Sequence, residues 1–168
     1  MTETLSAALP EDVEAAVHRV LKAACERELR LATAESCTGG LIASVLTDVE
    51  GVSHVFERGF VVYTDEAKAE ILGVPADLIE REGAVSRDVA VAMAEGGIAH
   101  SGADICLAVT GFSGPGGPGD EPGLVHFACL RRGGSPQHRE EHFGDIGRGE
   151  TRIACVRTAL DMIGACLG

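Results

Sequence analysis

The residues best suited to nucleophilic chemistry lie in one short segment, Glu-Ser-Cys-Thr-Gly-Gly at positions 35–40, between a strand-like run and an amphipathic helix. The first amides of a helix lack intrahelical partners, and the helix dipole favours negative charge beside them. Ser36 could therefore be a nucleophile, with an oxyanion hole formed by the amides of Cys37, Thr38, Gly39 and Gly40. The alternative is that Ser36 or Thr38 only caps the helix, although paired glycines favour close approach of a ligand.

Cys37 is the rival nucleophile, because a helix start also lowers the pKa of a thiol. A cysteine-dependent amidase would lose activity on thiol alkylation. In a serine enzyme, Ser36→Ala would instead abolish turnover, and Cys37→Ala would retain much of it.

Tyr63 and Lys68 form the second group that could do chemistry. Tyr63 is the only tyrosine, and Lys68 is one of two lysines in a chain that otherwise uses arginine for positive charge. Lysine, unlike arginine, readily loses a proton, and the start of a helix lowers its pKa. Asp65 and Glu66 raise the pKa of Lys68, so burial must decide whether the net shift is upward or downward. A neutral Lys68 could deprotonate Ser36, as in Ser-Lys hydrolases; the alternative is a solvated surface lysine.

A third region is the glycine-rich run 110–117, which follows a buried strand. Open α/β sheets bind ligands after such strands. The run is not a Walker loop, since the required Gly-Lys-Ser/Thr ending is absent. Either it contacts substrate or it is a flexible connection. The residues expected to contact substrate are Thr110, Gly111, Ser113 and Gly114.

Hydrophobic spacing predicts alternating helices and strands that would position these residues. This alternation indicates an α/β fold, a three-layer α/β/α sandwich with a mixed, mostly parallel sheet that ends in a hairpin. Helices are expected over 10–29, 41–51, 64–72, 75–82 and 86–102 and over a closing segment around 153–163, and strands over 31–34, 54–63, 104–110, 124–130 and 140–143.

Length and charge exclude several classes of function. The 168 residues suit one domain, here expected over 10–168 after a tail of residues 1–9. A net charge of −12 argues against nucleic acid or an anionic membrane surface as partner. No apolar run is long enough to span a membrane and the first twelve residues do not resemble a secretion signal, so a cytoplasmic location is expected. The six cysteines show no C-x-x-C, so neither disulfides nor a metal site is predicted.

Several separate motifs, in the same order, resemble the CinA C-terminal domain family over about residues 11–166. The resemblance is carried by Ala34–Gly40, Arg58–Lys68, Gly83–Ser86, Ala108–Gly117 and Gly123–His126. It implies an α/β/α sandwich and a stand-alone nicotinamide-nucleotide amidohydrolase (NMN deamidase). Such an enzyme converts nicotinamide mononucleotide (NMN) to nicotinate mononucleotide and ammonia in pyridine nucleotide salvage, without a cofactor. The family's catalytic Ser, Tyr and Lys correspond to Ser36, Tyr63 and Lys68.

The sequence departs from the family at two places. Phe112 replaces the usual Ile or Val after Thr-Gly, and segment 118–123 lacks a Lys-Pro that the family carries, which leaves phosphate binding in question. The substrate phosphate could be held by Arg58, Arg148 or Arg152, or by amides of the 111–117 run. A homo-oligomer is expected from the resemblance. The alternative function is a non-catalytic nucleotide-binding module.

Overall fold

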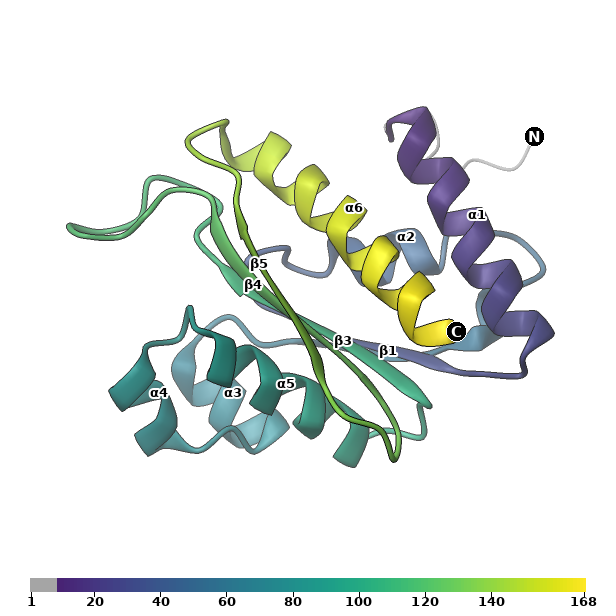
Figure 1. The fold of residues 1–168 in the computed structure, drawn as a ribbon, viewed down its shortest axis with the longest axis horizontal. Helices are drawn as coiled ribbons and strands as arrows, with labels where there is room; N and C mark the ends of the chain where they lie inside the picture. Colours follow the sequence, from purple (N-terminus) through teal and green to yellow (C-terminus); the bar gives the residue numbers. More distant parts are fainter. Residues whose placement is uncertain (1–8) are drawn as a thin grey trace.

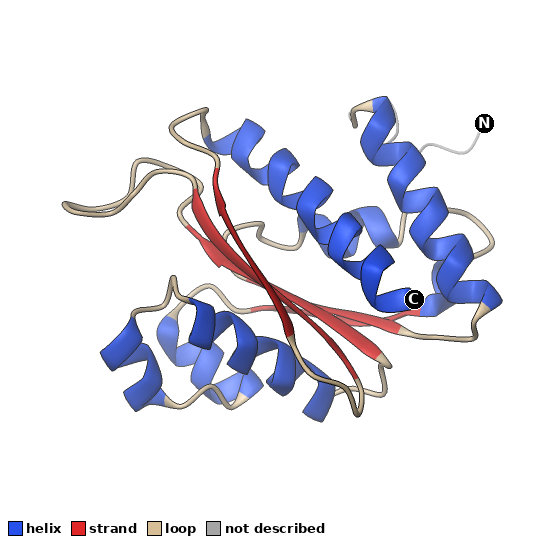
Figure 2. Ribbon diagram, viewed as in Figure 1, coloured by secondary structure: helices blue, strands red, loops and turns tan. Residues whose placement is uncertain are grey.

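The computed structural model describes residues 9–168. Helices lie on both sides of a central twisted sheet (Figure 1; Figure 2 separates the element types). Along the chain the elements are α1 (Glu11–Glu26), β1 (Leu31–Glu35), α2 (Leu41–Leu46), the 3₁₀ helix η2 (Ser53–Val55), β2 (Phe56–Val61), α3 (Asp65–Leu72), α4 (Ala76–Glu82), α5 (Arg87–Ala99), β3 (Ile105–Gly111), β4 (Leu124–Arg131), β5 (Gln137–His142) and α6 (Arg148–Leu167).

The sheet has five strands in the order β2-β1-β3-β4-β5. β1 pairs in parallel with β2 and β3, whereas β4 pairs antiparallel with β3 and β5. The predicted mixed sheet and its closing hairpin are therefore confirmed. The predicted α/β/α sandwich is confirmed as well, since α1, α2 and α6 cover one face and α3, α4 and α5 cover the other.

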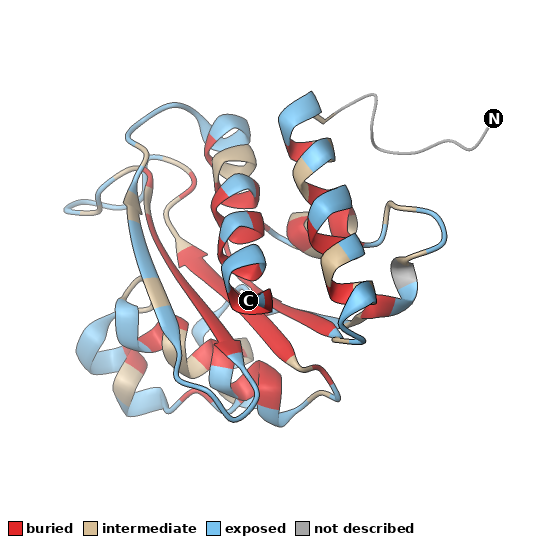
Figure 3. Ribbon diagram, turned by 45° about the vertical axis from the view of Figure 1, so that its right-hand side comes forward, coloured by how far each residue is buried: buried red, intermediate tan, exposed pale blue. Residues whose placement is uncertain are grey.

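Each face of the sheet has its own hydrophobic core, because successive residues of a strand point to opposite faces. On β3, the side chains of Ile105, Leu107 and Val109 join the core under α1, α2 and α6. Cys106 and Ala108 join the core under α3, α4 and α5. Figure 3 shows this burial along the central strands and on the helix sides that face them. The strands β1, β3 and β4 are thus buried on both faces, which leaves the strand ends as the place for a site.

Several element boundaries differ from the predictions. The helix expected to reach Gly51 ends at Leu46, where the Thr47 hydroxyl donates to the carbonyls of Ala43 and Ser44 at 3.1 and 2.9 Å. The strand expected over 54–63 is Phe56–Val61, because its partner β1 spans only Leu31 to Glu35, the residues paired with those two ends. The first helix ends at Glu26 rather than near Leu29, and the edge strand begins earlier, at Gln137.

The tail predicted over 1–9 lies, except for Leu9, outside the described residues, and Leu9 packs against the α1/α2/α6 core. All six cysteines are free thiols. Among the helices of the described residues, none combines the length and apolarity needed to cross a bilayer.

The strand order creates one place where a ligand site is expected. From β1 the chain crosses through α2 to β2 on one side, and from β2 it returns across β1 to β3 on the other side. In open α/β sheets ligands bind at the carboxyl ends of the strands, where the connections diverge in this way. The segments that follow β1, β2 and β3 contain Ser36, Tyr63 and Phe112, respectively.

Candidate active site

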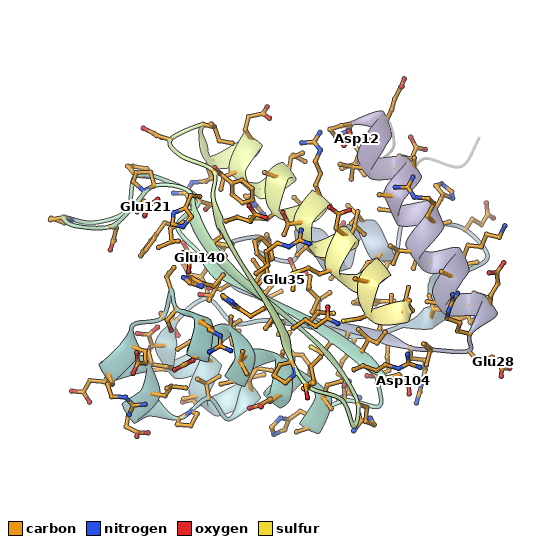
Figure 4. The ribbon with its side chains drawn as sticks, in the orientation of Figure 1. Asp12, Glu28, Glu35, Asp104, Glu121 and Glu140 are labelled. Atoms are coloured by element: carbon orange, nitrogen blue, oxygen red, sulfur yellow. The ribbon has the colours of Figure 1, made fainter. Side chains whose placement is uncertain are left out.

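The turn after β1 is held by the side chain of the last β1 residue. Glu35 is fully buried, and its carboxylate accepts four hydrogen bonds. The donors are the Thr38 hydroxyl at 2.6 Å and the amides of Gly40, Ile42 and Ala43 at 3.2, 3.0 and 2.7 Å. Glu35 therefore occupies the amino end of α2, where sequence reasoning expected ligand-binding amides. Figure 4 shows Glu35 in the interior of the molecule.

The backbone of this turn requires glycine. Gly39 and Gly40 have φ angles of +60° and +94°, in the region that side-chain-bearing residues rarely adopt. The turn holds Ser36 at the end of β1, where its amide donates to the Val109 carbonyl at 3.1 Å. The result is a serine fixed beside β3 at the edge of the parallel sheet.

Lys68 is a buried amine on the first turns of α3. Its side chain is only 2% exposed, and Nζ donates to the Tyr63 carbonyl at 3.1 Å. An oxygen of the half-exposed Asp65 lies 3.8 Å from Nζ. Burial lowers the pKa of Lys68 below its ordinary value, and the opposing effects of Asp65, Cys37 and Glu66 do not cancel this shift. Burial thus decides that the pKa of Lys68 is lowered, a direction that the sequence left open.

Ser36 and Lys68 line the same cavity, of about 270 Å³, at the carboxyl ends of β1, β2 and β3. The same cavity contains the predicted residues Cys37, Tyr63, Thr110, Gly111, Ser113 and Gly114, together with Arg148. The Thr110 hydroxyl donates to the Ala84 carbonyl at 2.8 Å, which ties β3 to the segment before α5. Residues far apart in sequence are therefore brought to one site.

Arg148, at the start of α6, is the one arginine in the lining. Its Nη1 donates to the Ser113 hydroxyl at 3.1 Å. Gly114 leaves room for the guanidinium, since a Cβ there would lie 2.7 Å from Nη2. Ser113 and Gly114 of the 111–117 run thus hold the Arg148 guanidinium at the cavity.

Arg58 and Arg152, the other two arginines proposed for phosphate, lie elsewhere. Arg58 pairs with Glu57 at 2.9 Å and donates to the His100 carbonyl at 2.7 Å, near the opposite ends of the parallel strands. Arg152 donates through Nη2 to the Thr38 carbonyl, behind the 36–40 turn. Neither Arg58 nor Arg152 lines the cavity, whereas Arg148 does.

Two of the four backbone amides predicted to form the oxyanion hole already have partners within the turn. The Gly39 amide donates to the Ser36 carbonyl at 3.1 Å, and the Gly40 amide is used by Glu35. Thr38 is fully buried and gives its hydroxyl to Glu35. Of the four residues, only Cys37 reaches the cavity beside Ser36.

Tyr63 contacts Lys68 through its backbone rather than through its phenol. The carbonyl of Tyr63 accepts from Nζ, while the residue is 67% exposed at the mouth of the cavity. Sequence reasoning did not assign Asp65, Ala84, Val85 or Phe112 to the site, although they line it. The sequence offered one clue to these residues, which is that they lie close along the chain to Lys68, Ser86 and Gly111. Within residues 9–168, no group of three or more His, Cys, Asp and Glu side chains is arranged to hold a metal ion.

Fold and cavity together define a three-layer α/β/α domain with a polar cavity at the carboxyl ends of its parallel strands. The CinA C-terminal domain family matches residues 13–167, and the chain belongs to that family.

Relatives of known sequence and structure agree with this membership. A CinA-like protein of Akkermansia muciniphila is 55% identical over 111 residues, which cover 65% of this chain and 27% of the relative. A CinA-like protein of Geobacter sulfurreducens is 46% identical over 153 residues, covering 90% and 36%. The chain therefore spans only about a third of the length of these relatives.

Solved structures of similar length superpose closely. The competence/damage inducible protein CihA from Agrobacterium tumefaciens has a TM-score of 0.91 at 46% identity, covering 98% of both chains. A competence-damaged protein (CinA) superfamily protein from Escherichia coli has a TM-score of 0.85 at 34% identity, covering 96% of this chain and 98% of that structure.

Proposed function

We propose that the protein is an amidohydrolase that converts NMN to nicotinate mononucleotide and ammonia, with Ser36 as nucleophile and Lys68 as base. The observation that carries the proposal is the buried Lys68, whose pKa is lowered, in the same cavity as Ser36. A buried amine with a lowered pKa has a larger neutral fraction near neutral pH and so acts as a general base.

The reaction proceeds through an ester of Ser36. Neutral Lys68 accepts the Ser36 hydroxyl proton while Oγ bonds to the carboxamide carbon. The carbon–nitrogen bond then breaks, and protonated Lys68 returns the proton to the nitrogen, so that ammonia leaves. Water adds to the nicotinoyl ester with Lys68 again as base, which releases the carboxylate and restores Ser36.

Charge in this reaction is stabilised by two other residues of the lining. The Cys37 amide is the donor we assign to the oxyanion, because Cys37 is the turn residue that lines the cavity beside Ser36. Arg148 is the residue we assign to the substrate phosphate, since its guanidinium lines the cavity and forms charge-assisted hydrogen bonds with anions. This local cation offsets the net charge of −12, which otherwise repels an anionic ligand.

The test is ammonia release from NMN by the purified chain, with and without EDTA. We expect release in both conditions, loss of it in Ser36→Ala, and full release in the matched control Ser44→Ala on α2. Cys37→Ala should lose less than about tenfold, since its backbone amide remains. Loss of turnover in Cys37→Ala together with retention in Ser36→Ala would instead establish the cysteine enzyme.

A second outcome would identify a binding module. If the folded wild-type chain binds NMN by calorimetry but releases no ammonia, the amidase proposal is wrong. The altered segment 118–123, which carries no lysine, is then the first region to change.

A further inference from the structure

Two aromatic residues line the cavity that contains Ser36. Tyr63 follows β2 and Phe112 follows β3, and the strand between them, β1, leads directly to Ser36. The proposed mechanism uses neither ring.

The spacing of the strands suits a third ring between them. Neighbouring strands lie about 4.8 Å apart, so the chain segments that continue β2 and β3 lie about 10 Å apart across β1. A planar ring in contact with an aromatic face on each side needs about 7 Å between those faces, since carbon atoms make contact at about 3.5 Å. The remaining distance accommodates the offset of the side chains from their backbones.

The backbone of Phe112 is held by hydrogen bonds, whereas the Tyr63 side chain is open to solvent. The Phe112 amide donates to the Leu124 carbonyl at 2.9 Å, and the Phe112 carbonyl accepts from the Gly123 amide at 2.9 Å. Tyr63 is 67% exposed, and only its backbone carbonyl is held, by Lys68. A large, exposed aromatic surface beside a cavity gains stabilisation when a ligand covers it.

We infer that Tyr63 and Phe112 form a slot that binds a planar pyridinium ring, stacked so that a substituent on the ring points to Ser36. A ring with a positive charge gains cation–π attraction from the aromatic faces, and Asp65 lies in the same lining. The inference deepens the proposed function and rests on it for the identity of the ring. It assigns the role of Tyr63 to its aromatic face, whereas a proton relay would use its hydroxyl.

The composition of the chain supplies a direct readout. Tyr63 is the only tyrosine and the chain has no tryptophan, so ultraviolet-excited tyrosine emission reports on this ring alone. In the non-hydrolysing variant Ser36→Ala, NMN and 1-methylnicotinamide should both quench this emission saturably, after correction for their absorbance against free N-acetyltyrosinamide. Ribose 5-phosphate, which lacks the ring, should not quench it. Absence of quenching by NMN in a sample that binds NMN by calorimetry would overturn the slot.

Substitutions separate the ring from the hydroxyl. The dissociation constant for NMN should be about tenfold larger in Tyr63→Leu than in Tyr63→Phe, because stacking on an aromatic face is lost only in the leucine variant. Phe112→Ile, which replaces the ring by an aliphatic side chain, should weaken NMN binding several-fold. The control Val61→Ala, an exposed neighbour outside the lining, should bind as the wild type does.

Two results would contradict the inference, and one would separate it from the amidase proposal. Equal affinity in the Phe and Leu variants, or equal loss of turnover in both with a shifted pH profile, would assign the function of Tyr63 to its hydroxyl. Quenching and ring-dependent affinity without any ammonia release would support the slot while the amidase proposal fails.

Discussion

Glu35 and Lys68 are both buried charged side chains beside the parallel strand ends, but their surroundings differ. The Glu35 carboxylate is satisfied by four donors, three of them backbone amides of one turn and helix. Lys68 has one carbonyl at 3.1 Å and a half-exposed carboxylate at 3.8 Å. A buried charge with a full set of partners stabilises a fold, whereas a buried charge with few partners is costly to keep and readily loses its proton. These surroundings support a structural role for Glu35 and the proposed role of Lys68 as base.

The largest expected effect is on turnover, in Lys68→Met. Removal of the base should lower ammonia release from NMN by about a thousandfold, within the range that general bases contribute. The folded state should survive, because methionine places an apolar side chain where an amine was buried. The matched control is Lys22→Met, the other lysine, which lies exposed on α1. A Lys68→Met variant that retains more than a tenth of the activity would contradict the assignment of Lys68 as base.

The next effect is on stability, in Glu35→Ala. Four donors would lose their acceptor, and we expect the free energy of unfolding to fall by at least about 3 kcal/mol, measured by urea denaturation. Glu35→Gln should lose less, because one acceptor oxygen remains. A loss below about 1 kcal/mol in Glu35→Ala would show that the saturated carboxylate does not hold the turn.

The third prediction concerns pH and follows from the direction of the Lys68 shift. Only the neutral amine accepts a proton, so kcat/KM should fall about tenfold per pH unit below the lowered pKa. Between that pKa and the ordinary value of 10.5, the unfolded chain binds a proton that the folded chain lacks. The Lys68 contribution to the free energy of unfolding should therefore rise with pH in this window.

Lys68→Met provides the comparison for the pH prediction. Its stability profile should lack the rise that the wild type shows as pH increases toward 10.5, measured by urea denaturation at each pH. A wild-type rate that increases as the pH is lowered would contradict the assignment of Lys68 as base.

The smallest expected effect concerns two arginines of α6, Arg148 and Arg152. Arg148→Gln should raise the KM for NMN about tenfold and change the KM for the phosphate-free riboside little, since the guanidinium lines the cavity. Arg152→Gln should mainly lower the melting temperature, because Arg152 is tied to the Thr38 carbonyl behind the turn. Steady-state kinetics and thermal unfolding of both variants separate the roles, and exchanged effects would reverse the assignments.

Much of the local structure followed from short-range patterns. The strand β1, the helix α3 with Thr64 as its cap, and the α5 start at the capping Ser86 are all close to the predicted positions. The ends of β2 were not predicted correctly, because they are set by its pairing with the five residues of β1.

The site residues divide in the same way. Residue types indicated Ser36 and Lys68, because a hydroxyl after a strand and a scarce lysine are local signals. The two aligned arginines of α6 could not be distinguished from sequence, since four residues along a helix place both on one side. Only the packing of α6 against the 36–40 turn and the 111–117 run separates Arg148 in the cavity from Arg152 behind the turn.

Periodicity, capping and side-chain chemistry are local properties, so the alternating elements, the α/β class and the candidate residues for acyl transfer could be predicted from sequence. The tertiary structure decided which helix amides remain for a ligand, since Glu35 reaches back to fill the start of α2. It also decided that the pKa of Lys68 is lowered. Desolvation depends on what packs around a group in three dimensions, and no neighbour in sequence reports it.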